Sequence, residues 1–286
     1  MSDSAMDRLK VLPQYLVPHH LLSRFMGLLA ESRWPLIRDN LVDFFINRYN
    51  IDMSIAAQPD PRAYATFNDF FTRALKDGVR PITEEGIACP ADGAVSQLGK
   101  IDDDRIFQAK GHHYTLTQLL GGDPERAAPF RNGDFITVYL SPRDYHRVHM
   151  PYGGVLKEMV YVPGRLFSVN TVTAQQVPAL FARNERVVAF FDTDIGPMAV
   201  VLVGAMIVAS IETVWAGLVT PPKRALKVTD YRPHNNTIDL ERGAEMGRFK
   251  LGSTAIVLFG PDAVKWKEGL GEGSPTCMGE QIASLL

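Results

Sequence analysis

The spacing of glycine and proline is the sequence feature that most constrains the fold of this chain. After Pro81, apolar and polar residues alternate with a period of about two, and glycines or prolines interrupt the pattern about every ten residues. Segments this short suit β-strands, which need only about five or six residues, better than they suit helices. The sequence therefore predicts a mainly antiparallel β body, sandwich-like or barrel-like.

The apolar runs between these turns give the expected strands. They include residues 94–98, 106–109, 135–140, 154–162, 186–191, 198–211 and 254–259. A short helix is expected at 178–183. The longest apolar run, 198–211, is interrupted by Gly204 and Ser210, and it is too short to span a bilayer. We therefore interpret it as one buried strand.

Helices are expected ahead of the β body. From Pro18 onward apolar residues recur at helical spacing, and Pro35 opens a second run of the same kind. Thr66 and Asp69 then fit a capping box that starts a short helix with an aromatic face. The predicted fold class is α+β, with amphipathic N-terminal helices in region 1–65 and a β-rich catalytic domain in 66–286.

The composition excludes several classes of protein. With 46% hydrophobic residues the 286-residue chain can bury a sizeable core, and its net charge of -2 gives no basic field for nucleic acid. The two cysteines, Cys89 and Cys277, form no CxxC pair and predict neither a disulfide framework nor a cysteine-rich metal site. No metal is expected.

The N-terminal segment is cationic in a chain that is otherwise slightly acidic. Between Arg8 and Arg48 there are six Lys or Arg residues against three acids. Two explanations remain open. The helices pack on the protein's own core, or their apolar faces enter the headgroup layer of an anionic membrane to which the basic residues are attracted.

Three places hold polar groups that a core does not require. Asp92 precedes Gly93 in what is also an ordinary Asx-turn signature, and His146 and His149 follow an apolar strand. The third place, residues 212–217, ends the long apolar run, and its plain explanation is a Trp that fills the edge of the core.

The couplet Gly252-Ser253 ahead of an apolar run is a separate feature. Its plain explanation is a bulge or turn that opens a strand. Its chemical explanation is that the Ser253 hydroxyl attacks the preceding carbonyl and turns the amide into an ester, for which it needs a base.

In joint order these stretches resemble the phosphatidylserine decarboxylases, of the bacterial membrane-associated type. The motifs are Pro-Ala-Asp-Gly at 90–93, Asp-Tyr-His-Arg-Val-His-Met-Pro at 144–151 and Phe-Lys-Leu-Gly-Ser-Thr at 249–254. Further stretches of the same kind lie at 67–71, 161–164, 180–186, 212–217 and 245–249. The resemblance runs from about Phe67 to the end, while residues 223–243 and the first fifty look less like the family.

The resemblance implies a proenzyme that processes itself. Asp92, His149 and Ser253 would form the triad that cleaves the chain between Gly252 and Ser253, giving a large chain (1–252) and a small chain (253–286). Ser253 would become a covalent pyruvoyl cofactor, which forms a Schiff base with phosphatidylserine and accepts the electrons released with carbon dioxide. His146 would be an acid or a substrate-orienting group, and a histidine bonded only to backbone is the alternative.

The resemblance also implies partners and a location. The product would be phosphatidylethanolamine, the enzyme would be a homodimer of processed pairs, and it would attach peripherally to the cytoplasmic side of the cell membrane. Two other functions stay open. An Asp-His-Ser set in this chain order also occurs in serine hydrolases, although no G-x-S-x-G elbow is present. A noncatalytic lipid-binding β domain would need only the amphipathic N-terminus and the β body.

Overall fold

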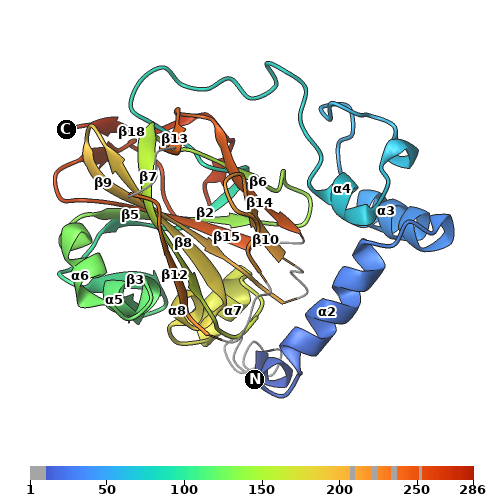
Figure 1. Ribbon diagram of the computed structural model, residues 1–286, viewed down its shortest axis with the longest axis horizontal. Coiled ribbons are helices and arrows are strands. Elements are labelled where there is room, and N and C mark those ends of the chain that lie inside the picture. The colour runs from blue at the N-terminus through green and yellow to red at the C-terminus, as the bar shows by residue number, and fades with distance from the viewer. Residues whose placement is uncertain (1–10, 207–209, 221–224, 233–236, 251–252) are drawn as a thin grey trace.

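The computed structural model describes residues 11–206, 210–220, 225–232, 237–250 and 253–286. A group of N-terminal helices stands beside a larger body of strands, with short helices along one side of that body (Figure 1). The ladders between the described strands are antiparallel, and these strands form open sheets and no closed barrel. The predicted α+β class with a mainly antiparallel body is confirmed.

The helices are short except for two at the N-terminus. Those two, α2 (His19–Ala30) and α3 (Pro35–Tyr49), begin close to Pro18 and Pro35, as predicted. The others are η1 (Leu12–Tyr15), η2 (Pro61–Ala63), α4 (Phe67–Phe71), α5 (Leu116–Leu119), α6 (Pro124–Ala127), η3 (Ala128–Phe130), α7 (Thr171–Gln176) and α8 (Leu180–Arg183). The capping box of α4 is confirmed, because Thr66 and Asp69 each accept a hydrogen bond from the other's backbone N–H.

A nine-stranded sheet forms the centre of the molecule. Its order is β12-β7-β8-β9-β15-β5-β2-β17, and β13 also pairs with β7. The strands are β2 (Gly93–Lys100), β5 (Asp134–Leu140), β7 (Gly154–Val162), β8 (Arg186–Thr193), β9 (Gly196–Val203), β12 (Lys227–Asp230), β13 (Asp239–Leu240), β15 (Ser253–Phe259) and β17 (Pro275–Thr276).

Three smaller sheets complete the body. A four-stranded sheet has the order β11-β10-β14-β6, and a three-stranded sheet has the order β1-β18-β16. The remaining sheet is the hairpin β3-β4. Their strands are β1 (Ile87–Ala88), β3 (Arg105–Ala109), β4 (His112–Thr115), β6 (Arg147–His149), β10 (Ser210–Thr213), β11 (Gly217–Leu218), β14 (Glu245–Lys250), β16 (Val264–Trp266) and β18 (Gln281–Leu285).

Two predicted elements differ from the structure. The run 198–211 is not one strand, because β9 ends at Val203 and β10 belongs to the four-stranded sheet. Near this break the N–H of Gly204 bonds to the carbonyl of Glu185, and a Cβ on residue 204 would lie 3.2 Å from that oxygen. The helix expected at 178–183 forms only from Leu180.

Strand β15 is buried along its whole length between two hydrophobic cores. Ala255 and Val257 enter the first core, whereas Ile256 and Leu258 enter the second, as the period of two in a strand requires. A strand covered on both faces needs apolar residues at every position, which explains the unbroken run after Thr254.

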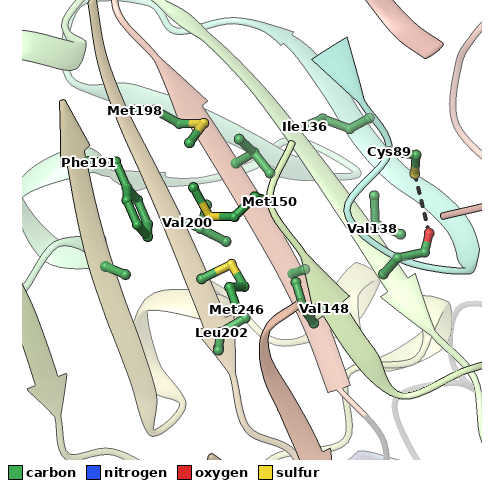
Figure 2. Packing of buried hydrophobic residues seen from close by; sticks show 14 of the residues in the cluster. Cys89, Ile136, Val138, Val148, Met150, Phe191, Met198, Val200, Leu202 and Met246 are labelled. Atoms are coloured by element: carbon green, nitrogen blue, oxygen red, sulfur yellow. Dashed lines mark hydrogen bonds between the residues drawn. The ribbon is translucent and has the colours of Figure 1, made fainter. Parts of the chain in front are cut away.

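The first core lies between the nine-stranded sheet and the two sheets built around β14 and β18. Figure 2 shows Met198, Val200 and Leu202 of the large sheet in one cluster with Val148, Met150 and Met246 of the covering segments. The second core lies on the opposite face, under α5, α7 and α8. The face of β15 that carries its odd-numbered residues therefore looks toward β6 and β14.

A third, smaller cluster joins α3 to α4. Val42 packs with the aromatic rings of Phe67, Phe70 and Phe71. This cluster spans residues on both sides of position 65. The pairing of a helix from the N-terminal region with α4 is therefore part of what holds the N-terminal helices to the rest of the chain.

Helix α2 turns its apolar side outward. Leu21, Phe25 and Leu28 are 68%, 57% and 76% exposed, whereas His19 and Ser23 on the same helix are buried. Leu21, Phe25 and Leu28 therefore do not pack on the protein's own core, whereas Ala30 at the end of α2 lies in the third cluster. No helix in the described part of the chain is long and apolar enough to cross a bilayer.

Candidate active site

Ser253 is the first residue of β15 and is fully buried. Its backbone pairs with Leu140 at the end of β5, and its side chain lies on the same face as Ala255. The Ser253 hydroxyl has no hydrogen-bond partner among the described residues. A buried hydroxyl without a partner is costly and uncommon in folded proteins, and Thr254 has one as well, so what distinguishes Ser253 is its place directly after Gly252. Gly252, the predicted attack point, lies outside the described residues.

His149 is held at both ring nitrogens. Nδ1 donates to the carbonyl of Gly243 at 2.8 Å, and the hydroxyl of Tyr145 lies 3.0 Å from Nε2. Because a carbonyl only accepts, these partners assign the proton to Nδ1 and make Nε2 the acceptor of the Tyr145 hydroxyl. Burial lowers the pKa of His149, and it raises the pKa of Tyr145 to about 12. Neutral His149 thus has Nε2 available as a base once Tyr145 releases it.

The backbone of His149 ties β6 to the predicted Asp92 turn. The N–H of His149 donates to the carbonyl of Pro90 at 2.8 Å. In the ladder between β6 and β14, His149 lies opposite Glu245. Its neighbours Val148 and Met150 both enter the first core. The alternation of side chains therefore points the imidazole of His149 away from that core.

His146 is completely buried in the loop between β5 and β6. Its Nδ1 lies 2.8 Å from the carbonyl of Asp144 and donates to it, and its ring packs on Phe71 with 4.0 Å between ring centroids. Nε2 has no partner among the described residues. Burial lowers the pKa of His146 to about 3. His146 is therefore a neutral imidazole with an unpaired basic nitrogen.

Asp92 forms hydrogen bonds with Arg80 and Met278 and not with His149, its predicted partner. Its carboxylate accepts from Arg80, with Nη2 at 2.6 Å and Nε at 2.9 Å, and from the backbone N–H of Met278 at 2.8 Å. Since both ring nitrogens of His149 also have other partners, the structure does not contain the expected Asp92–His149 hydrogen bond. The charge of Asp92 still raises the pKa of His149, as the smallest of several contributions.

The segment that carries His146 lies close to Ser253 at one end of the first core. The loop that carries His146 leaves β5 directly after Leu140, the residue opposite Ser253. The carbonyl of His146 accepts from the N–H of Phe249 in β14 at 3.0 Å, and Phe249 precedes Ser253 by four residues. The structure therefore brings these segments together, and it shows no direct hydrogen bond among Asp92, His149 and Ser253.

Three polar residues of this region were missed by sequence reasoning. Tyr145 lies inside the quoted 144–151 motif, Arg80 precedes Pro81, and Arg73 follows α4. Arg73 is only 3% exposed and stacks on the Phe70 ring at 5.5 Å. A lone arginine after a helix carries no sequence signal that it will be buried, because arginine is usually exposed. In the described part of the chain, no cluster of three His, Cys, Asp or Glu side chains suits a metal ion.

Comparisons with known proteins identify the family of this chain. A family model described as phosphatidylserine decarboxylase matches residues 67–284, and a second model described as PSD matches residues 9–50. The chain therefore belongs to the phosphatidylserine decarboxylase family. The suspected family membership is confirmed. The expectation that the first fifty residues look less like the family is wrong, because the second model matches there.

Curated relatives named phosphatidylserine decarboxylase proenzyme align over nearly the whole chain. The protein of Pseudomonas aeruginosa (strain LESB58) is 66% identical over 97% of both chains. That of Stutzerimonas stutzeri is 65% identical over 96% of this chain and 94% of its own. That of Pseudomonas putida (strain F1) is 65% identical over 97% of this chain and 98% of its own. The similarity thus extends into the first fifty residues, beyond the motifs found by inspection.

Proposed function

We propose that this chain is the precursor of a decarboxylase that converts phosphatidylserine to phosphatidylethanolamine with a pyruvoyl group made from its own Ser253. The names of relatives that are about two-thirds identical over the full length support the reaction and the proenzyme state. The structural observation that carries the proposal is the fully buried Ser253 hydroxyl, which has no partner among the described residues and directly follows Gly252.

The first step is self-cleavage. As the Ser253 hydroxyl gives its proton to a base, Oγ bonds to the Gly252 carbonyl carbon, the amide C–N bond breaks, and the freed nitrogen is protonated. Loss of the Ser253 α-proton then expels the Gly252 carboxylate as the new end of the large chain (1–252). Water hydrolyses the resulting imine to a ketone and releases ammonia, which leaves the small chain (253–286) blocked.

His149 is the base that we propose for this step. Its pKa is lowered by burial, so it is neutral near pH 7, and the Gly243 carbonyl fixes the proton on Nδ1. For direct transfer to Nε2, the Tyr145 hydroxyl must give up its hydrogen bond. For Asp92 to complete the triad it must also exchange Arg80 for His149, so we propose that Asp92 acts only after this rearrangement.

The site fits a pyruvoyl group. Forming the group removes the hydroxyl of Ser253, and that hydroxyl has no partner to lose among the described residues. When present, the group supplies an electron sink for the bond that breaks as carbon dioxide leaves. His146 is neutral with Nε2 unpaired, so we propose that it accepts a hydrogen bond and orients the substrate. A proton-donating role would need a pKa far above about 3.

The membrane surface is the second proposed partner. The outward face of α2, with Leu21, Phe25 and Leu28, would enter the headgroup layer, and the three excess positive charges between Arg8 and Arg48 would favour anionic lipid. We propose that region 1–65 attaches peripherally at the cytoplasmic side of the cell membrane, while 66–286 carries the chemistry. A homodimer of processed pairs is the assembly that we propose by family resemblance.

The intact mass of the purified protein tests the main proposal. We expect two chains, with the large one ending at Gly252 and the small one resistant to Edman degradation. Thr254→Val is a matched control that should still yield two chains, because Thr254 is also buried and its hydroxyl also has no partner within the described ranges. One full-length species with unmodified Ser253 would favour a serine hydrolase, and a readable N-terminal serine would indicate ordinary proteolysis.

A further inference from the structure

Arg73 is a buried cation with unused hydrogen-bond donors. Its side chain is 3% exposed, and neither Nε nor Nη1 has a partner among the described residues. The guanidinium of Arg73 stacks on the face of the Phe70 ring, which attracts a cation but accepts no conventional hydrogen bond. Buried guanidinium groups are normally paired with an anion or with carbonyl oxygens, so Arg73 calls for an acceptor.

Arg73 lies beside the candidate active site. The residue two before it, Phe71, packs on the ring of His146, and the carbonyl of Thr72 accepts from Nε of Arg147 at 2.9 Å. These two contacts fix the chain at 71–73 against the loop that leads into β6. In agreement, the charge of Arg73 helps to lower the pKa of His146.

The nearby carboxylates are occupied by other donors. Asp92 is bound by Arg80, and Asp144 accepts from both the backbone N–H and the hydroxyl of Ser141 at 2.7 Å. Both acids act on Arg73 only through their longer-range charge. The open donors of Arg73 therefore have no acid in the described part of the chain committed to them.

We propose that Arg73 binds the phosphodiester of the lipid headgroup through these unpaired N–H groups. This inference rests on the proposed function, which brings an anionic headgroup to the loop that holds His146. A guanidinium is well suited to the oxygens of a phosphate, and in a buried site the pairing is strong because water does not compete.

The substrate carries a second anion, its carboxylate, which is the less suitable partner. As carbon dioxide leaves, the negative charge moves out of the carboxylate toward the electron sink. A cation bound to the carboxylate would therefore stabilise the substrate more than the transition state and slow the reaction. The phosphodiester keeps its charge throughout, so Arg73 can hold it without this penalty.

Steady-state kinetics with a soluble short-chain phosphatidylserine test the proposal. Arg73→Gln should raise KM about tenfold or more, as expected for the loss of charged hydrogen bonds, and Arg73→Lys should recover part of the loss. Short-chain phosphatidylmethanol, which has the phosphodiester but neither amine nor carboxylate, should inhibit the wild type competitively. Its inhibition constant should rise by a similar factor in Arg73→Gln.

Arg183→Gln is the matched control, because Arg183 also stacks on an aromatic ring, Phe167 at 5.0 Å, but lies on α8. It should leave both constants unchanged. An unchanged inhibition constant in a processed Arg73→Gln enzyme would overturn the proposal, and a raised KM alone would assign Arg73 to the carboxylate. A wild type that makes no phosphatidylethanolamine would instead refute the proposed function.

A gel that shows the small chain establishes that each variant has matured. If neither Arg73 variant matures, a crystal structure of the processed wild type with short-chain phosphatidylmethanol decides the question. Phosphate density against Nε or Nη1 of Arg73 would support the proposal. Phosphate bound elsewhere, with these donors still unpaired, would overturn it.

Discussion

Two buried arginines in this molecule have opposite surroundings. Arg186 opens β8 and is 2% exposed, and Arg73 beside the candidate site is 3% exposed. The guanidinium of Arg186 donates to four backbone carbonyls, those of Gln118, Leu119, Ala182 and Asn184. Nε and Nη1 of Arg73 donate to none among the described residues.

The difference separates two uses of buried polarity. Arg186 ties β8 to α5 and α8, two helices that cover the second core, so its burial serves the fold. Nε and Nη1 of Arg73, Nε2 of His146 and the Ser253 hydroxyl all lack hydrogen-bond partners in the part of the chain that the structure describes. A protein tolerates such unpaired groups where a substrate or a reaction uses them. Variants can test this distinction at each kind of site.

Ser253→Ala should have the largest effect on function and a small one on stability. Self-cleavage and decarboxylation should both be abolished, because the attacking oxygen is gone. The free energy of unfolding should change by no more than about 1 kcal/mol, since removing an unpaired buried hydroxyl breaks no hydrogen bond. Intact mass and urea unfolding measure the two effects. A large loss of stability would show that Ser253 has a structural partner after all.

The second largest effect should be a difference in self-cleavage between variants of His149 and His146. His149→Ala and Asp92→Asn should leave the uncleaved precursor, whereas His146→Ala should still permit some cleavage and lower decarboxylation in the mature fraction. The reason is that only His149 is proposed as the base, and His146 is proposed to orient the substrate. A gel of each variant after prolonged incubation shows the result. Complete loss of cleavage in both histidine variants would refute this division of roles.

Arg186→Met should be the most destabilising of the arginine variants. It removes four hydrogen bonds, two of them buried and two partly buried, and leaves four carbonyls without that donor, so we expect a loss of about 3–5 kcal/mol in the free energy of unfolding. Arg73→Met should cost less than about 1 kcal/mol, because Nε and Nη1 have no bonds to lose. Urea unfolding of both in the Ser253→Ala precursor makes the comparison. Equal losses would contradict the distinction between the two arginines.

His146 predicts a specific dependence of stability on pH. Its pKa is about 3 in the folded chain and about 6.5 unfolded, so only the unfolded chain gains a proton between these values. The contribution of His146 to the free energy of unfolding is fully present above pH 6.5 and is lost as the pH falls toward 3. About 2 kcal/mol of it is lost by pH 5. His146→Gln should remove this part of the slope. The control His113→Gln, which changes an exposed imidazole, should retain it.

The sequence predicted those parts of the molecule that follow from local periodicity. The start of α2, the Thr66 capping box and the span of β7 are as expected, because turn residues and alternation determine them. The break after Val203 was missed, because a long apolar run looks alike whether it forms one strand or two. Sequence patterns also do not predict which side chains bond to each other. Asp92, for example, pairs with Arg80 rather than with His149. That pairing depends on how distant segments pack.

Apolar side chains of the N-terminal helices also divide into a structural group and a proposed functional group. Substitutions in the second group should have the smallest effects. Val42 of α3 is fully buried against the aromatic rings of α4, whereas Leu21, Phe25 and Leu28 of α2 face outward. Deleting residues 1–50 to test membrane binding would also remove Val42 and unpack Phe71 from its neighbours, and Phe71 supports His146. Substitutions on α2 alone therefore make the sharper experiment.

The triple variant Leu21→Ser, Phe25→Ser, Leu28→Ser should sediment less with anionic liposomes. The wild type should bind peripherally and be partly released by high salt, because salt screens the attraction between basic residues and anionic lipid. Self-cleavage should continue in the variant, and its free energy of unfolding should change by less than about 0.5 kcal/mol, as for exposed positions generally. Undiminished binding to the liposomes would show that the outward face of α2 is not the membrane contact.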